Sequence, residues 1–123
     1  MKDELISFET AKLAYQKGVK LNESARVGFS PNGLELSECF WNYHCNEKNS
    51  IPRSTQSLLQ RWLREEYEFI ILINYSYWDD NFMFEICGRR VNSDILLGID
   101  FSNRFETYEE ALESGLINAL NLI

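Results

Sequence analysis

Cys39, His44 and Cys45 are the residues whose types and spacing come nearest to a metal site or to a nucleophile with its base. We predict a strand here, on which Cys39 and Cys45 point to one face and His44 to the other. Six residue steps separate the two cysteines and span about 20 Å on a strand, and a disulfide needs Cα atoms within roughly 7 Å. A zinc site needs similarly close ligands. We therefore predict no metal site and no disulfide.

The other groups that could do chemistry are typical of solvated surface. Glu65-Glu66, Asp79-Asp80 and Glu109-Glu110 are sequence neighbours in predicted helix or turn positions, not converging acid and base partners. Gly88 and Gly98 stand alone, so no glycine-rich phosphate loop is present. No turn resembles a nucleophile elbow. We expect no catalytic residues, no cofactor and no enzyme activity.

Two segments could bind a ligand. The first is Arg53, Ser54 and Thr55, at the predicted start of a helix, where free N–H groups, hydroxyls and a cation could hold a phosphate or a carboxylate. We favour a plain capping segment as the role of these three residues, with anion binding as the alternative.

The second segment is the half-polar face of a predicted sheet, which could stack a ring and hydrogen-bond its edge. The same face could instead form a homo-oligomer interface, which we favour over binding of a ligand or another protein, or it could be plainly exposed. The predicted ligand or partner residues are Asn74, Ser76, Trp78, Glu85 and Arg89.

Length and composition indicate one domain over residues 1–123, with 45% hydrophobic and 14% aromatic residues and no low-complexity run. The longest mostly apolar runs are far shorter than the ~20 residues of a membrane span. The N-terminus does not resemble a signal peptide, and three cysteines are unlike a secreted disulfide set. We expect a cytoplasmic protein that does not enter membranes.

The chain is acidic, with a net charge of −7, and the excess lies in the second part. Residues 1–50 hold seven acidic and six basic side chains, whereas residues 51–123 hold twelve and six. Affinity for nucleic-acid backbones depends on Lys and Arg, so we expect no such binding. A surface that keeps the protein soluble accounts for the acidity most simply.

The first part predicts a short helix and a hairpin. Ser7 can cap a helix with apolar residues at helical spacing, and Gly18 can end it. The turn residues Ser30 to Gly33 then separate two predicted strands, Ala25 to Phe29 and Leu34 to Cys45.

A second helix follows from the stripe of Leu58, Leu59, Trp62 and Leu63, opposite a polar side that includes Gln56. Ser54 is the simplest cap for this helix. A start at Ser50, with Pro52 in the first turn, is the alternative.

Two strands, Tyr67 to Trp78 and Phe82 to Val91, are predicted by aromatic and β-branched content. Pairing Trp78 with Met83 separates apolar from polar side chains, and it places Tyr77 opposite Phe84 beneath Trp62. Asp80-Asn81 is then the loop centre. The apolar face holds Phe69, Ile71, Ile73, Tyr75, Tyr77, Phe84 and Ile86.

A third strand, Ile95 to Phe101, extends this meander. Thr107 and Glu110 form a capping box for a last helix, in which Gly115 permits close approach to the sheet. The predicted fold class is α+β, a single domain with an antiparallel meander packed by two or three helices.

Several of these segments together resemble a group of small uncharacterised proteins of bacteriophages and of mobile elements of gut bacteria. The residues that carry the resemblance are Arg53 to Glu65, Phe105 to Glu113, Ala119-Leu120 and Thr10 to Ala14. The resemblance implies expression inside an infected bacterium, where small phage proteins often blunt host defence.

We expect a non-enzymatic phage accessory protein that sequesters a small nucleotide-like signal or binds a host protein. A structural or assembly module of the phage particle or its replication machinery is the alternative, and a minor hydrolase is the third.

Overall fold

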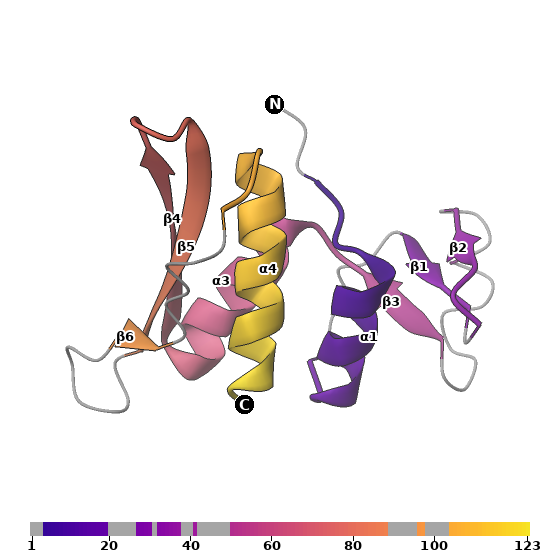
Figure 1. The fold of residues 1–123 in the computed structure, drawn as a ribbon. Helices are drawn as coiled ribbons and strands as arrows, with labels where there is room; N and C mark the ends of the chain where they lie inside the picture. The colour runs from indigo at the N-terminus through magenta and orange to yellow at the C-terminus, as the bar shows by residue number, and fades with distance from the viewer. Residues whose placement is uncertain are drawn as a thin grey trace. The chain divides into compact units, whose positions relative to one another are not determined.

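The computed structural model describes residues 4–19, 27–30, 32–37, 41, 50–88, 96–97 and 104–123. These residues form helices and two antiparallel sheets, which confirms the α+β class (Figure 1). None of the described helices has the length and apolar character that crossing a membrane requires. The chain divides into two compact units, residues 1–55 and 56–123, and each is described below by itself. That the whole chain is one domain stays a prediction.

The first unit combines one helix with a small sheet. Helix α1 (Phe8–Gln16) begins after Ser7, whose Oγ accepts a hydrogen bond from the Thr10 N–H at 3.2 Å. Gly18 follows its end in the left-handed region, with a φ of 82°. The predicted cap and stop of this helix are both confirmed. The antiparallel sheet has the order β2-β1-β3 and consists of β1 (Val27–Phe29), β2 (Glu35–Leu36) and β3 (Ile51–Arg53).

The predicted hairpin is present, but its second strand is much shorter than expected. β1 pairs with β2, and the Ser30 N–H donates to the Leu34 carbonyl at 2.9 Å across the turn. Trp41, which the prediction placed in that strand, is helical instead, and its N–H donates to the Ser37 carbonyl.

β3 was not predicted, and the alternative helix start at Ser50 is wrong. Pro52 lies in β3 opposite Gly28, on an edge strand, where a proline does not break the ladder. The backbone of Gly28 makes room for Trp41 on this sheet. A Cβ at Gly28 would lie 2.2 Å from the indole Cε3, so glycine is required there.

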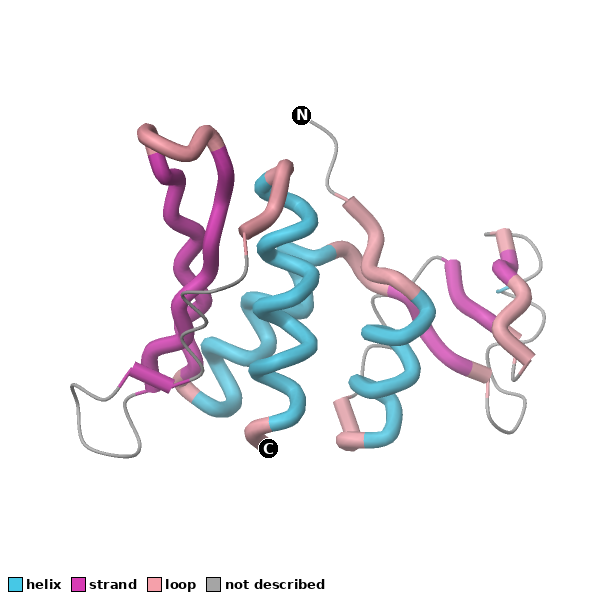
Figure 2. Tube along the Cα trace, viewed as in Figure 1, coloured by secondary structure: helices cyan, strands magenta, loops and turns pink. Residues whose placement is uncertain are grey.

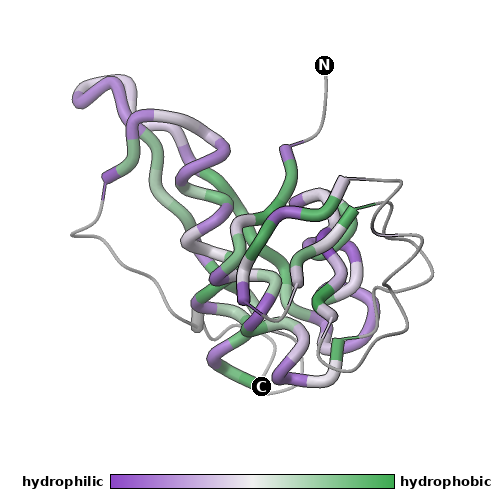
Figure 3. The backbone as a smooth tube through the Cα atoms, turned by 90° about the vertical axis from the view of Figure 1, so that its right-hand side faces the viewer, coloured by the Kyte–Doolittle hydropathy of each residue, from purple (hydrophilic) through white to green (hydrophobic). Residues whose placement is uncertain are grey.

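The second unit is a meander covered by two helices, as predicted. The strands are β4 (Phe69–Ser76), β5 (Asn81–Gly88) and β6 (Leu96–Leu97), in the order β4-β5-β6. Helices α3 (Gln56–Tyr67) and α4 (Tyr108–Asn121) pack on the sheet and on each other (Figure 2). Green, apolar stretches alternate with purple ones along the strands and helices in Figure 3, as expected for elements with one buried side.

The two helices of this unit differ in how their predicted starts compare with the structure. Thr107 caps α4, because its Oγ1 accepts from the Glu110 N–H at 3.1 Å. The first residue of α3 is Gln56, so Ser54 does not directly precede the helix. The Ser54 hydroxyl instead donates to the Thr55 carbonyl at 3.0 Å.

The pairing of β4 with β5 differs from the predicted register by four residues. Ile73 lies opposite Phe84, and Tyr75 lies opposite Phe82. The turn therefore spans 77–80 and not 79–82, and Tyr77 does not reach Phe84. Because the shift is an even number of residues, each strand residue keeps its predicted face. Phe69, Ile71, Phe84 and Ile86 are buried on the inner face, as expected.

Helix α4 lies close against the inner face at Gly115, which confirms the predicted role of this glycine. A Cβ there would lie 2.9 Å from Cγ2 of Ile71 and 3.4 Å from Cγ of Phe84. Gln56, which we predicted on the polar side of α3, is buried and links the two helices. Its Nε2 donates to the Glu109 carbonyl and to Oε1 of Glu113, both at 2.9 Å.

Gly115→Val should destabilise the protein by about 2 kcal/mol or more, because the added methyl groups overlap Ile71. Urea unfolding measures this loss. In an Ile71→Ala background the penalty should fall by at least about 1 kcal/mol, since residues in contact are energetically coupled. Asn118→Val, at an exposed site of the same helix, controls for helix propensity. An equal Gly115→Val penalty in both backgrounds would contradict the contact.

Candidate functional site

The structure brings together only part of the predicted ligand or partner site. Asn74, Ser76 and Glu85 lie on the outer face of the β4–β5 sheet, the face opposite the buried side chains of Ile71 and Phe84. Trp78 belongs to the turn and not to this face, because of the four-residue difference in register. The fifth residue, Arg89, lies outside the described residues.

The outer face is more apolar than a solvated sheet face usually is. Ile70 and Leu72 are exposed on it, and Met83 and Cys87 are half-buried beside them. Asn74 pairs with Met83, and Glu85 lies opposite Leu72. The polar groups of this face are thus spread among apolar ones and do not converge as the groups of a small-ligand site do.

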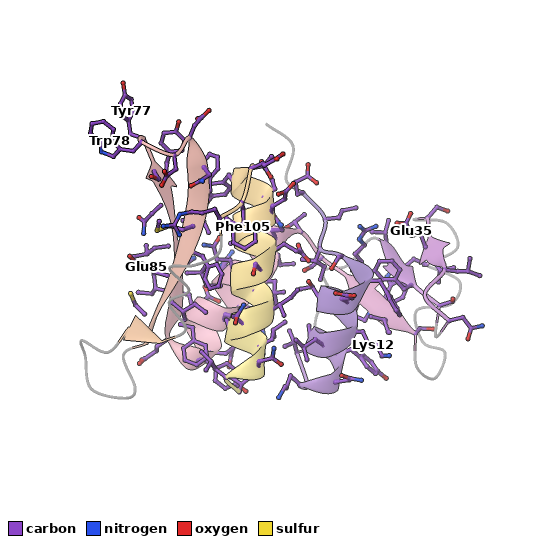
Figure 4. All side chains as sticks on the ribbon, in the orientation of Figure 1. Lys12, Glu35, Tyr77, Trp78, Glu85 and Phe105 are labelled. Carbon is purple, nitrogen blue, oxygen red and sulfur yellow. The ribbon has the colours of Figure 1, made fainter. Side chains whose placement is uncertain are left out.

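The strongest surface feature is the turn itself, at the end of the β4–β5 hairpin. Tyr77 is 81% exposed and Trp78 is 92% exposed, and their ring centroids lie 6.1 Å apart, edge to face. Figure 4 shows both side chains projecting from the end of the hairpin, with Glu85 farther along it. We call the turn residues Tyr77, Trp78, Asp79 and Asp80 the aromatic tip.

Local hydrogen bonds hold the two carboxylates of the aromatic tip. Ser76 Oγ donates to Oδ2 of Asp79 at 3.2 Å, and the Tyr75 hydroxyl donates to Oδ1 of Asp80. The Asp80 N–H donates to the Ser76 carbonyl at 2.9 Å, and Asp80 adopts a left-handed conformation with a φ of 52°. Aspartate tolerates this conformation better than most residues. The turn is therefore closed by its own backbone and side chains.

Aromatic packing supports the base of the tip. The ring of Phe82 lies 5.1 Å from that of Tyr75 and 6.3 Å from that of Tyr108, the first residue of α4. The backbones of Phe82 and Phe105 exchange two hydrogen bonds, at 2.8 and 3.0 Å. These contacts connect the hairpin to the start of α4 and stabilise the end of the hairpin that bears the tip.

The predicted anion-binding residues are engaged with other groups of the first unit. Nε of Arg53 donates to the Ile6 carbonyl at 2.5 Å, and its Nη1 lies 3.4 Å from Oε1 of Glu35. The guanidinium also lies 4.9 Å from the centroid of the Phe29 ring. Ser54 is buried. A cation that already faces a carboxylate offers little attraction to an anion, so the structure does not favour an anion site here.

The described residues offer no constellation for metal binding. Among them, no group of three histidine, cysteine or acidic side chains could hold a metal ion. Cys39, His44 and Cys45 lie outside the described residues. Cys87 is a free thiol on the outer face.

Tyr77 was predicted to lie in the core, so it was not among the predicted site residues. One signal could have found it: the run from Ser76 to Asn81 ends in two aspartates and an asparagine, residues that favour turns over strands. Moving the turn toward the N-terminus would have exposed Tyr77 and Trp78 together. Comparison with known proteins adds nothing to this site, since no protein-family model, no curated protein and no solved structure matches the chain.

The hydrogen bond between the Tyr75 hydroxyl and Asp80 can be tested by measuring the pKa of Tyr75. The hydrogen bond raises the pKa of Tyr75 above its ordinary value, and loss of hydration and the negative charge of Asp80 act in the same direction. Asp80→Asn should lower this pKa toward about 10. NMR of the Tyr75 ring measures it, and Asp79→Asn is the matched control.

The raised pKa of Tyr75 also makes the stability of the fold depend on pH. A folded-state pKa above the unfolded value stabilises the fold below about pH 10, and that contribution is lost as the pH rises through the folded pKa. An identical Tyr75 pKa in wild type and Asp80→Asn would contradict the hydrogen bond.

Proposed function

We propose that this chain acts by binding another protein and not by catalysis, and that the aromatic tip makes the contact. The exposure of Tyr77 and Trp78 carries this proposal. Tyrosine and tryptophan are among the side chains that most often dominate binding energy at protein interfaces. Here they lie next to each other on a short turn with a hydrogen-bonded backbone, so little backbone freedom is lost when a partner covers them.

Of the two modes of action expected for a phage accessory protein, the tip supports occupation of a protein over sequestration of a small signal. Small ligands are usually held in concave sites that bury most of their surface. Two rings that are 81% and 92% exposed enclose nothing, but they can enter a recess on a partner. The resemblance to phage and mobile-element proteins makes a defence protein in the cytoplasm of the bacterial host the partner that we propose.

Replacing both rings should abolish partner binding. The tagged full chain, the variant Tyr77→Ser/Trp78→Ser and the control Tyr15→Ser/Leu34→Ser are expressed in the bacterial host. Quantitative mass spectrometry then compares the proteins that co-purify. The control removes two exposed apolar side chains from the first unit. A true partner should be retained by wild type and control and lost at least about tenfold by the tip variant, since two hot-spot truncations together exceed about 1.4 kcal/mol.

Two results would contradict the proposal. One is equal recovery of every co-purifying protein with the tip variant. The other is release of a stoichiometric nucleotide-like compound from the heat-denatured chain, which would support sequestration instead. A compound that the chain consumes would identify a hydrolase.

Self-association through β4 is the second candidate, and it fits the alternative of an assembly module and the expected homo-oligomer. β4 is an edge strand of the described sheet, and none of its eight residues is charged. Natural edge strands usually carry a charge or a proline that blocks pairing with another chain. Ile70 and Leu72 are exposed on the same strand.

Leu72→Lys should convert such an oligomer to monomer, because a lysine on an edge strand opposes pairing with a second sheet. Light scattering on the eluting protein measures the mass of wild type and variant. Leu34→Lys, which charges an exposed position of the first unit, is the control. A wild type that elutes as a monomer at micromolar concentration would exclude this candidate.

A further inference from the structure

The aromatic tip combines two exposed rings with two acidic residues in the same turn. Asp79 and Asp80 follow Trp78 directly, and both are exposed. Their carboxylates accept hydrogen bonds from Ser76 and Tyr75, which hold them to the turn that also carries the rings. From Phe69 to Gly88 the sequence has three acidic side chains and no basic one. A partner that binds this four-residue turn therefore approaches two carboxylates as well as two rings.

The rest of the second unit extends this negative field. Residues 56–123 hold twelve acidic and five basic side chains and no lysine, whereas residues 1–55 hold seven of each. All of the net charge of the chain thus belongs to the unit that carries the tip. A field of one sign steers and selects a partner of the opposite sign.

We propose that the aromatic tip recognises a cationic surface of its partner, with arginine as the residue that contacts it. This inference rests on the proposed function, and it names the chemistry of the partner. A guanidinium can stack on the face of Trp78 or Tyr77 and at the same time hydrogen-bond to Asp79 or Asp80. Lysine supplies the charge but neither the planar stacking nor the fork of donors.

The same arrangement argues against other partner chemistries. A phosphate backbone would be repelled by the carboxylates. A purely apolar surface that covered the rings would remove Asp79 and Asp80 from water without supplying an opposite charge, which is strongly unfavourable. A cationic surface can make cation–π contacts with the rings and ion pairs with the carboxylates at the same time.

The probe is a set of three short glycine peptides that differ only in carrying two arginines, two lysines or two glutamates. Each is titrated into the full-length ¹⁵N-labelled chain. The arginine peptide should shift the Trp78 indole N–H and the amides of residues 77–80 most, the lysine peptide should bind several-fold more weakly, and the glutamate peptide should not bind. Shifts centred elsewhere, or equal binding of arginine and lysine peptides, would overturn the inference.

Matched charge variants separate the tip from general acidity. Asp79→Asn/Asp80→Asn keeps one acceptor oxygen at each position, and asparagine tolerates the left-handed conformation of residue 80. Glu66→Gln/Glu68→Gln removes the same charge from exposed positions of the same unit. The tip variant should weaken binding of the arginine peptide at least about fivefold, and the control less than about twofold. Equal losses would overturn the inference, and circular dichroism verifies that each variant is folded.

The host co-purification experiment distinguishes failure of this inference from failure of the proposed function. If Asp79→Asn/Asp80→Asn keeps the partner that Tyr77→Ser/Trp78→Ser loses, the tip binds a protein but not through a cationic surface. If both variants keep it, the proposed function fails as well. Loss of the partner with both variants supports the inference.

Discussion

The close approach of α4 to the sheet at Gly115 is the constraint on which the arrangement of the second unit depends. The helix backbone lies close to the side chains of Ile71 and Phe84, and the inner face of the hairpin therefore packs against α4. Gln56 then ties α3 to α4, and Gln60 Nε2 donates to the Ile71 carbonyl at 3.0 Å. Among the described residues of this unit, both helices lie on the inner side of the hairpin, so neither helix covers its outer face.

The first unit uses its polar groups in a different way. Arg53 is bound by a carbonyl, a carboxylate and a ring of its own unit, so its charge serves folding. The acidic and basic residues of this unit are equal in number. The second unit differs because one of its turns carries two exposed rings and two exposed carboxylates. This contrast supports our proposal that residues 56–123 contain the binding surface.

Local signals in the sequence were sufficient for much of this structure. The caps at Ser7 and Thr107 follow from short-range hydrogen bonds, and the faces of β4 and β5 follow from alternation, which any even register preserves. Alternation cannot choose between registers that differ by four residues. That choice depends on Asp80 in the turn and on Phe82 bonding to Phe105, a contact between residues far apart in the sequence. β3 was missed for the same reason, because its pairing with β1 is long-range. The error in register also affected the predicted site, because it placed Tyr77 in the interior and so left Tyr77 out of the site.

The positions of the tryptophans have a practical consequence. Trp41 is 1% exposed in the first unit, Trp62 is half-buried, and Trp78 is 92% exposed at the tip. An indole in water emits at longer wavelength than one in an apolar site. Unfolding of the first unit should therefore move Trp41 emission to the red, whereas a ligand that covers Trp78 should move its emission to the blue. Intrinsic fluorescence can thus distinguish loss of structure in one half of the chain from occupancy of the other, without any added label.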